Sequence, residues 1–472
     1  MTVGTLDSAP PKDRAIAQKF YFAAWRWHFY AGLYVVPFLI MLAVTGLIIL
    51  WFTTVAPEYG DRIAIPVGEK ALSITDQAKA ALQTYPEGSI GKYVAPYGPA
   101  NPALFQVNLE GGNRMIALDP YTGKVVQDRA QDGTWNEFAT SIHGELMIGG
   151  NGGFGDLLIE IAASLGIILL VTGLYLWWPR NRQSWRDVLV INLAARGRAF
   201  WKSLHVTTGF WMSIILLFFL ISGLSWAGVW GGKFVQAWST FPAAKWDNVP
   251  LSDKTHAEMN HGAEKDVPWA LEQTPMPMSD GSSGAAGLPE GLPIVLQNIV
   301  SYARTIGFDG RFQVNAPADA TGVWTLSRDS MSYDSLDPTS DKTVHIDQYT
   351  GRVLATVDYA DYSVPGKAMA VGIALHEGQL GWWNIALNAF FCFAIIAIAV
   401  SGVVMWWKRR PGGSFRLGAP PLPDAMPMWK GAVVIMLALS FIFPVAGITL
   451  LAVLALDVIL LSNVPRLKAA LN

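Results

Sequence analysis

The sequence predicts an α-helical integral membrane bundle of four core spans plus a C-terminal helical segment, with two extramembrane α+β domains produced by an internal duplication. Three observations predict this fold class: an apolar composition, a few long apolar runs, and a set of motifs that occurs twice. The 472 residues are 52% hydrophobic and only 15% charged, and the mean hydropathy is +0.31. Such values are typical of membrane proteins, and the 20 tryptophans favour the headgroup level of a bilayer.

Five apolar runs are long enough to cross a bilayer. They cover about residues 28–53, 154–178, 200–228, 380–407 and 430–463. The first run is longer than the hydrophobic part of a secretory signal, so we expect a spanning helix there and not a cleaved leader. The last run contains Pro444. It is long for one perpendicular span and short for two, so it is either one kinked, tilted helix or a re-entrant pair.

Lysine and arginine are distributed unevenly between the segments that connect these runs. They are concentrated in residues 1–27, 179–199 and 408–429, and the positive-inside rule places these segments in the cytoplasm of a bacterial cell. The chain is then a multi-pass protein of the inner membrane, with residues 54–153 and 229–379 forming two periplasmic domains. The net charge of −2 gives no indication of a nucleic-acid partner.

The two periplasmic segments share one pattern. Each begins with a helical periodicity, at residues 72–84 and 292–304, continues with alternating strands, and reaches a tight Asp-x-Tyr-Thr-Gly turn at 119–123 or 347–351. Glycine at the end of such a turn supplies the backbone freedom that a hairpin needs. Residues 250–290 break the pattern because they are rich in Pro, Gly, Ser and Met, and they are predicted to be a linker or insertion.

The membrane runs repeat as well. Two runs begin with a histidine, a glycine one turn later and a deeper hydroxyl–glycine pair: His28, Gly32, Thr45 and Gly46, then His205, Gly209, Ser222 and Gly223. The other two runs follow a histidine and end in a hydroxyl–glycine pair before two tryptophans: His143, Thr172 and Gly173, then His376, Ser401 and Gly402. The unit of span, outer domain and span therefore occurs twice.

The four repeated histidines predict two bis-histidine haem sites. A histidine in or beside a membrane helix is costly to bury unless it has a partner. His28 and His205 start outward-going helices near the cytoplasmic face, whereas His143 and His376 precede inward-going helices near the periplasmic face. Each pair can supply both axial ligands of one haem iron. The alternative is that each histidine is interfacial or simply hydrogen-bonded. Because Cys392 is the one cysteine, any haem must be held non-covalently.

Small and basic residues beside the cytoplasmic pair are predicted to belong to the same site. Gly32 and Gly209 follow their histidines by one turn on the same helix face, where glycine leaves room for a flat macrocycle. The deeper glycines of the repeat could act likewise, and close helix packing is the alternative for all of them. Arg26 and Lys202 could pair with haem propionates, although simple anchoring at the cytoplasmic face explains them equally well.

Three residues of the insertion, His256, Met259 and His261, are of types that suit copper or a transient metal site. A solvated linker is the favoured interpretation of that segment. His345, on the strand that enters the second tight turn, is expected on the protein surface.

Two further patterns have weaker implications. Asp156 and Glu160 form an i, i+4 pair at the outer start of the second span and could relay protons or contact a cation, or could be interfacial. Residues 150–155 match G-x-G-x-x-G, but no βαβ unit surrounds them, so nucleotide binding is not expected there. Without a recognisable flavin or nicotinamide domain, the electron donor must be external, either a membrane quinol or a cytoplasmic reductase.

Taken together, the paired Asp-x-Tyr-Thr-Gly turns, the His-x-x-x-Gly helix starts, the Trp-Trp helix ends and the His-Gly-Glu and His-Glu-Gly segments resemble the PepSY-associated transmembrane family. The resemblance covers nearly all of residues 20–463, except the insertion. It implies an association with iron uptake and, through the FoxB-like ferric-siderophore reductases of the family, two b-type haems. It also implies two PepSY-like outer domains that frame a substrate surface.

The leading hypothesis from the sequence is a transmembrane ferric-chelate reductase. Electrons would enter at the haem of His28 and His205, pass to the haem of His143 and His376, and reach a ferric siderophore or other ferric chelate between the outer domains. One alternative is a non-enzymatic membrane protein whose outer domains bind or restrain a periplasmic protein. The other is a metal transporter that uses the histidines with the carboxylates of the second span.

Overall fold

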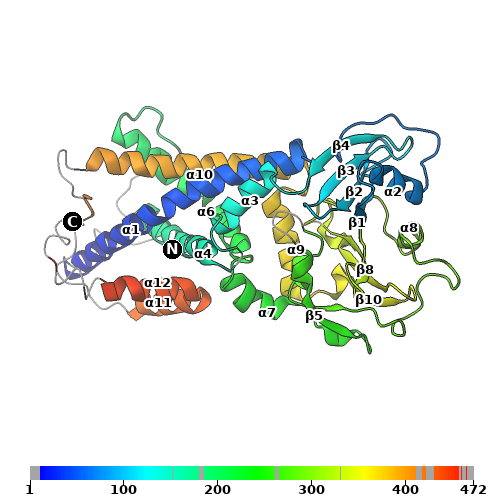
Figure 1. Cartoon of the computed structure of the whole chain (residues 1–472). Helices are drawn as coiled ribbons and strands as arrows, with labels where there is room; N and C mark the ends of the chain where they lie inside the picture. The colour runs from blue at the N-terminus through cyan, green and yellow to red at the C-terminus, as the bar shows by residue number, and fades with distance from the viewer. Residues whose placement is uncertain are drawn as a thin grey trace. The chain divides into compact units, whose positions relative to one another are not determined.

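The computed structural model describes residues 11–150, 152–179, 185–260, 265–329, 331–410, 417–420, 430–456, 459 and 464. The chain divides into two compact units, coloured along the chain in Figure 1. The helical unit comprises Met1–Gly46, His143–Phe234 and Ala389–Asn472, and the sheet unit comprises Leu47–Ile142 and Val235–Asn388.

Four helices are long and apolar enough to cross a membrane, as the sequence predicted. They are α1 (Pro11–Leu50), α4 (Phe154–Trp177), α6 (Arg198–Leu224) and α10 (Trp382–Arg409). The structure corrects one boundary, because α1 starts well before residue 28 and includes much of the segment expected to be a separate N-terminus. At 1.5 Å per residue its 40 residues exceed the roughly 30 Å of a hydrocarbon core.

The core of the helical unit forms where α1, α6 and α10 meet. Phe219 of α6 stacks on Phe391 of α10, with ring centroids 4.3 Å apart, and Ala43 of α1 is buried beside them. Helix α4 packs closely on α6, because a Cβ atom added at Gly166 would lie only 3.2 Å from the Leu220 side chain. Glycine at that position therefore lets the two helices approach, as small residues do between membrane helices.

The C-terminal segment forms two short helices, α11 (Lys430–Ile442) and α12 (Pro444–Leu456), which lie side by side in Figure 1. The break falls at Pro444, which cannot continue the backbone hydrogen bonding of α11. The two helices approach closely at Gly447, where a Cβ atom would come within 2.8 Å of the Ser440 Cβ. Each helix of 13 residues is about 20 Å long, too short to cross a bilayer alone. Of the two alternatives for residues 430–463, the described part favours the pair.

The sheet unit is built on one antiparallel sheet whose order, in the described part of the chain, is β10-β9-β8-β7-β1-β2-β3-β4. The strands are β1 (Ser89–Val94), β2 (Ala103–Asn108), β3 (Arg114–Leu118), β4 (Val125–Ala130), β7 (Gln313–Asn315), β8 (Val323–Arg328), β9 (Lys342–Asp347) and β10 (Val353–Asp358).

The two halves of the duplication join at the centre of this sheet, where β1 pairs antiparallel with β7 and Tyr93 lies opposite Val314. The sequence predicted two separate outer domains, and the structure corrects this to one continuous sheet. The physical reason is that an unpaired β1 or β7 would leave a row of backbone donors and acceptors without partners.

Helices α2 (Ile74–Leu82) and α8 (Leu296–Thr305) contact each other and pack on the sheet, and both were predicted. They cover a core that includes Phe105, Ile116, Phe308, Phe312 and Leu326. The two predicted tight turns are also present, with Gly123 at φ +73° and Gly351 at φ +69°. In each turn the preceding aspartate, Asp119 or Asp347, accepts backbone N–H groups of the turn.

The insertion is folded, so the prediction of a linker is wrong. It contains a small hairpin, β5 (Leu251–Thr255) with β6 (Pro275–Pro277), and a buried segment around Trp269 and Leu271. Asp266 of the insertion pairs with Lys92 of β1 at 2.6 Å, and both are buried. Trp269, Ala270 and Leu271 form one buried 3-10 turn, and Ala270 and Leu271 pack in a cluster with Phe241, Trp246 and Val357. The described part of the chain also contains the helices α3 (Trp135–Glu145), α5 (Arg186–Leu189), α7 (Gln236–Ser239) and α9 (Val364–Glu377).

Candidate functional site

His28 of α1 and His205 of α6 face each other in the helical unit. Their ring centroids are 6.3 Å apart and their planes are at 87°. Two metal–nitrogen bonds of about 2 Å, with about 1.1 Å from each nitrogen to its ring centre, place two axial imidazoles about 6 Å apart. The rings form an edge-on pair, and a centroid distance of 6.3 Å also leaves room for one metal atom between them. The predicted pairing of these two histidines in space is therefore met.

The His28 ring is held at its Nδ1 atom. Nδ1 lies 3.0 Å from the carbonyl oxygen of Leu169 and 3.1 Å from the hydroxyl of Thr172, both on α4. The Thr172 hydroxyl donates its single proton to the carbonyl of Ile168 at 2.7 Å. It must therefore accept from Nδ1–H, and this tautomer leaves the lone pair of Nε2 free to bind a metal.

His205 repeats this arrangement on α10. Its Nδ1 atom lies 3.0 Å from the carbonyl oxygen of Ile398 and 3.2 Å from the Ser401 hydroxyl. Ser401 donates to the same Ile398 carbonyl at 2.8 Å, so it too accepts from Nδ1–H. A hydrogen bond from the second ring nitrogen to a carbonyl is the usual support of a metal-bound histidine.

The deeper glycines of the repeat make room for these imidazoles. A Cβ atom added at Gly173 would lie 3.1 Å from Cε1 of His28, and one at Gly402 would lie 3.4 Å from Cε1 of His205. Room for the macrocycle and close helix packing were the two alternatives for these glycines, and in the structure the space that they leave is occupied by the histidine rings. Of the two glycines next to the histidines, Gly209 has nothing within 4 Å of an added Cβ, and Gly32 only Leu169 at 3.7 Å.

His143, at the end of α3, shows the same contacts a third time within the helical unit. Its Nδ1 atom lies 2.8 Å from the hydroxyl of Thr45, which donates to the carbonyl of Met41 at 2.8 Å. A Cβ atom added at Gly46 would lie 3.6 Å from Cε1 of His143. The hydroxyl–glycine pairs of α1, α4 and α10 are thus histidine-binding pairs, a role that the repeat in the sequence could have indicated.

His376 lies near the end of α9 in the sheet unit, where its backbone carbonyl accepts from Asn388. The fourth hydroxyl of the repeat, Ser222, donates to the carbonyl of Phe218 at 2.8 Å, as the other three donate within their own helices. The pairing of His376 with His143 remains a prediction from the sequence repeat.

The two basic residues predicted near the first pair differ in their surroundings. Arg26 donates to the carbonyl of Pro420 at 2.7 Å and to the Tyr30 hydroxyl at 3.1 Å, so it holds the segment after α10. Lys202 is exposed on α6. Anchoring at the cytoplasmic face and contact with a propionate both remain predictions for Arg26 and Lys202.

Asp156 and Glu160, buried in α4, bind backbone and not a cation. The Asp156 carboxylate accepts from Gly152 N and Gly228 N, and the Glu160 carboxylate accepts from Val229 N and Trp230 N. Three of these hydrogen bonds fix the chain that follows α6, and the fourth fixes the turn before α4. A proton relay or a transport site at this pair is therefore disfavoured.

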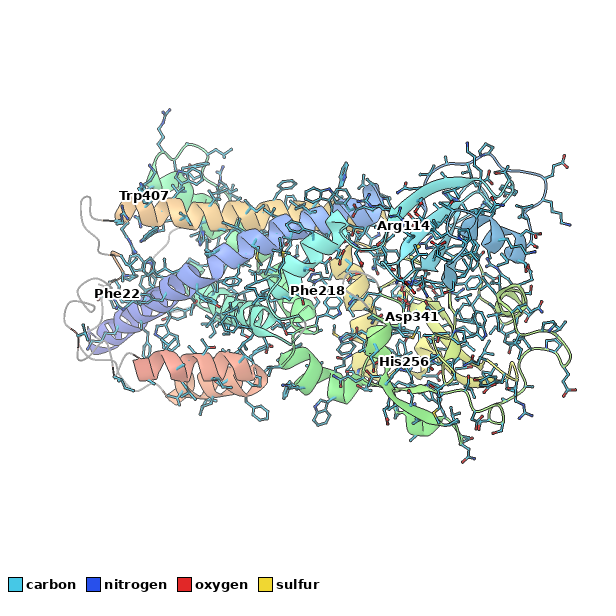
Figure 2. The ribbon with its side chains drawn as sticks, viewed as in Figure 1. Phe22, Arg114, Phe218, His256, Asp341 and Trp407 are labelled. Atoms are coloured by element: carbon cyan, nitrogen blue, oxygen red, sulfur yellow. The ribbon has the colours of Figure 1, made fainter. Side chains whose placement is uncertain are left out.

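The histidine of the insertion that the structure describes, His256, is fully buried against His345 of β9 (Figure 2 labels His256). Their Nε2 atoms lie 2.9 Å apart, and the Nδ1 atom of His256 lies 2.6 Å from the Thr274 carbonyl. The prediction of a surface position for His345 is wrong, because the folded insertion covers it. Both nitrogens of His256 have partners, so it is a poor metal ligand here.

The other two members of that proposed metal set give no support to it. Met259 is half-buried, and His261 lies outside the described residues. Among the described residues no group of three His, Cys, Asp or Glu side chains is arranged to hold a metal ion.

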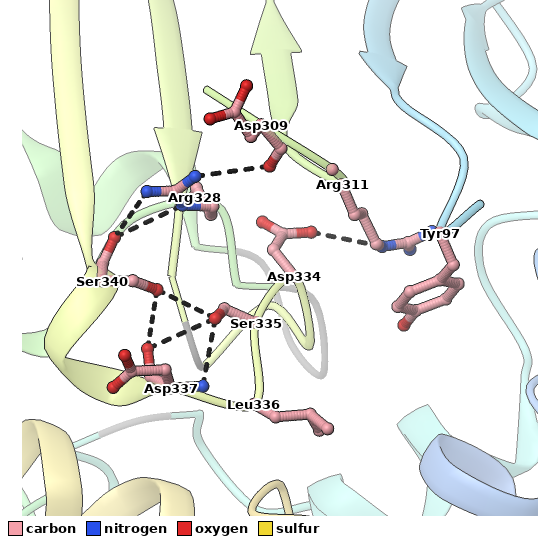
Figure 3. A pocket seen from close by; sticks show the side chains of 10 residues that line it. Tyr97, Asp309, Arg311, Arg328, Asp334, Ser335, Leu336, Asp337 and Ser340 are labelled. Atoms are coloured by element: carbon pink, nitrogen blue, oxygen red, sulfur yellow. Dashed lines mark hydrogen bonds and ion pairs between the residues drawn. The ribbon is translucent and has the colours of Figure 1, made fainter. Parts of the chain in front are cut away.

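A polar pocket of about 400 Å³ opens in the sheet unit, and sequence reasoning did not find it. Figure 3 shows Arg328 reaching the carbonyl oxygens of Asp309 and Ser340, and Asp334 directed at Arg311. Arg311 pairs with Asp334 at 3.2 Å and stacks on Tyr97, with Cζ 4.1 Å from the ring centre. Burial raises the pKa of the Asp334 carboxyl to about 7, against the opposing effect of the arginine.

No curated protein matches the chain at a significant level. The family model described as the PepSY-associated TM region matches residues 25–409. These residues include α4, α6, α10, the part of α1 from residue 25, the three hydroxyl-bound histidines, His376 and the whole described sheet. That match covers most of the sequence. The chain belongs to the PepSY-associated transmembrane family.

Proposed function

We propose that this membrane protein is a dihaem b oxidoreductase that transfers electrons across the bilayer to a ferric chelate. One observation carries the proposal: the His28 and His205 rings lie 6.3 Å apart, and each is tied through Nδ1 in the tautomer that leaves Nε2 available. A structural edge-on pair could have the same spacing, so the feature that favours a ligand pair is that both rings are fixed in the tautomer that leaves Nε2 available.

The residues of the chain would bind and orient the cofactor. His28 and His205 would be the axial ligands of one haem, and Gly209 leaves open space beside them for a macrocycle. A haem supplies one-electron chemistry through the ferric and ferrous states of its iron. Since the sequence repeats the same histidine, hydroxyl and glycine, His143 and His376 are proposed as the ligands of the second haem.

The polar pocket of the sheet unit is the proposed docking place of the electron acceptor. Its arginines, carboxylates and hydroxyls offer hydrogen bonds to the oxygen-rich surface of a ferric siderophore or a similar chelate. Reduction by one electron gives ferrous iron, which hard siderophore oxygens hold less strongly. The electron comes from a donor outside this chain, a membrane quinol or a cytoplasmic reductase. By the positive-inside rule the acceptor side is the periplasm of a bacterial inner membrane.

The test is the spectrum and the haem content of the purified full-length protein. We expect a Soret band and an α band that sharpen on reduction, and about two haems per chain. His28→Ala and His205→Ala should each remove the same haem, and Ser213→Ala, a buried hydroxyl of α6 that touches no histidine, should remove neither. A folded but colourless protein from haem-replete cells would overturn the proposal and leave a non-enzymatic binding role.

The route of the electron is tested with the same variants. In His376→Ala the haem of His28 and His205 should still be reduced by the physiological donor, while reduction of a ferric chelate should fall steeply. In His28→Ala the remaining haem should stay oxidised with that donor and still accept electrons from a small reductant added outside. Chelate reduction by His376→Ala at the wild-type rate would remove the second pair from the path.

A further inference from the structure

We infer that the hydroxyl groups of Thr172, Ser401 and Thr45 are positioning residues that set the reduction potentials of the two haems through the Nδ1–H groups of their ligands. The inference rests on the proposed function and names residues of the same sites. The sequence repeat adds Ser222 as the fourth member, because it corresponds in the repeat to Thr45, the hydroxyl of His143, as His376 corresponds to His143.

Each hydroxyl is an obligate acceptor toward its histidine. A hydroxyl has one proton and two lone pairs, and in all three cases the proton goes to a carbonyl three or four residues earlier in the same helix, at 2.7 or 2.8 Å. The lone pairs then face the ring nitrogen at 3.1 Å for His28, 3.2 Å for His205 and 2.8 Å for His143. The ring can neither rotate nor change tautomer without losing this bond.

A general property of membrane helices explains only half of this arrangement. Serine and threonine in such helices commonly donate back to their own backbone, and Ser213 and Thr449 do so at 2.7 Å without any histidine nearby. What separates the three positioning hydroxyls from these two is the imidazole on the neighbouring element and the glycine that follows the hydroxyl. That combination occurs in three places in the helical unit, so chance packing does not account for it.

The electronic effect has a definite direction. An acceptor on Nδ1–H makes the imidazole a stronger donor to its metal, and a stronger donor stabilises the ferric over the ferrous state. Each hydroxyl therefore lowers the potential of its haem. All three histidines also have a backbone hydrogen-bond partner, Leu169 for His28 and Ile398 for His205 at 3.0 Å from Nδ1 and Leu42 for His143, which would keep part of the effect when the hydroxyl is lost. Thr45 makes the shortest of the three contacts, so its loss should matter most.

The experiment is a spectroelectrochemical titration of the full-length protein with Thr172→Val, Ser401→Ala and Thr45→Val. Thr172→Val and Ser401→Ala should move the haem that His28→Ala removes to a more positive potential, and Thr45→Val should move the other haem by a larger amount. Haem retention should fall about tenfold, as expected for loss of a group that supports a ligand. Thr172→Ser should restore the wild-type potential, while Ser213→Ala and Thr449→Val should leave both potentials unchanged.

The outcomes separate this inference from the proposed function. If the wild-type protein binds no haem, the proposed function fails and the inference fails with it. If both haems bind but their potentials and retention in the three variants equal those of the two control variants, the inference alone is overturned. A potential that shifts equally in the control variants would also overturn it, because the change would then report general packing.

Discussion

The Nε2 atoms of His256 and His345 lie 2.9 Å apart in the sheet unit, and neither side chain is exposed. His256 must donate from Nδ1, because its partner there is the carbonyl oxygen of Thr274. When both rings are neutral, His345 donates from Nε2 and its Nδ1 atom accepts from the hydroxyl of Thr325 at 3.0 Å. All four ring nitrogens are then satisfied without any charge, and the pair ties the insertion to β9.

This pair predicts a loss of stability in mild acid. Burial lowers the pKa of His256 to about 4 and lowers the pKa of His345 as well, with the neighbouring histidine as a further cause. A free histidine titrates near 6.5, so below that pH the unfolded chain takes up protons that the folded pair does not. The contribution of the pair to the free energy of unfolding is therefore fully present above pH 6.5. Protonation of His256 in the unfolded chain should lower the free energy of unfolding by about 2 kcal/mol between pH 6.5 and 5.

Thermal unfolding of the detergent-solubilised protein at pH 7.5 and 5.0 measures this loss. A His256→Gln, His345→Gln double variant provides the control: its midpoint should be lower at pH 7.5 but should change less on acidification. An equal drop in the double variant would assign the acid sensitivity to other groups.

Glu160→Gln should destabilise the helical unit without changing haem content. An amide keeps one acceptor but turns an NH₂ group toward a backbone N–H of Val229 or Trp230, and a buried donor without a partner costs about 1–3 kcal/mol. The midpoint of denaturant unfolding measures the loss, and Asp187→Asn, an exposed carboxylate of α5, is the matched control. An unchanged midpoint together with slower electron transfer would place Glu160 on the reaction path.

Gly173→Ala and Gly209→Ala should both lower the occupancy of one haem, for different reasons. The added methyl group at Gly173 would press on the His28 ring at 3.1 Å, whereas at Gly209 it meets no protein atom within 4 Å. Loss of haem in Gly209→Ala would therefore report contact with the macrocycle itself. Haem content per chain measures both variants, and Gly111→Ala, in open space of the sheet unit, is the control. Full occupancy in Gly209→Ala would mean that the macrocycle lies elsewhere.

The orientation of the chain is open to a direct test. Reporters fused after Gln183 and after Pro411 should behave as cytoplasmic, and reporters after Gly112 and Gly284 as periplasmic. The reason is that lysine and arginine are concentrated in residues 179–199 and 408–429, the segments that contain Gln183 and Pro411. Reporter activity in whole cells gives the answer. The opposite result at Gln183 and Gly112 would exchange the two haem faces.

The sequence was sufficient for the features that depend on local pattern. Hydropathy located the four long helices, and repetition located the tight turns at Gly123 and Gly351 and the histidines that share one set of contacts. It was not sufficient where a distant partner decides the outcome. The backbone N–H groups that donate to Glu160 belong to Val229 and Trp230, about 70 residues further along the chain. No feature of the sequence around Glu160 indicates these partners.

The dependence on distant partners also explains why three predictions for the sheet unit were wrong: the surface position of His345, the unfolded linker and the two separate domains. His345 alternates along β9 as a surface residue could, and only the folded insertion places it inside. The apolar residues of the insertion, such as Trp269, have no helical or strand period because they fill gaps on an existing surface. Pairing of β1 with β7 joins residues more than 200 positions apart, and no local signal specifies a partner for an edge strand.

The junction of β1 with β7 has a consequence for the origin of the chain. Antiparallel pairing of two equivalent strands is the contact that a twofold axis generates between identical subunits. A chain that carried only one half would expose β1 as an open edge, and a second copy of that chain would be its natural complement. The present sequence therefore has the form of a covalently fused homodimer whose halves need not be identical: the second half carries the folded insertion, and the described part of the first half does not.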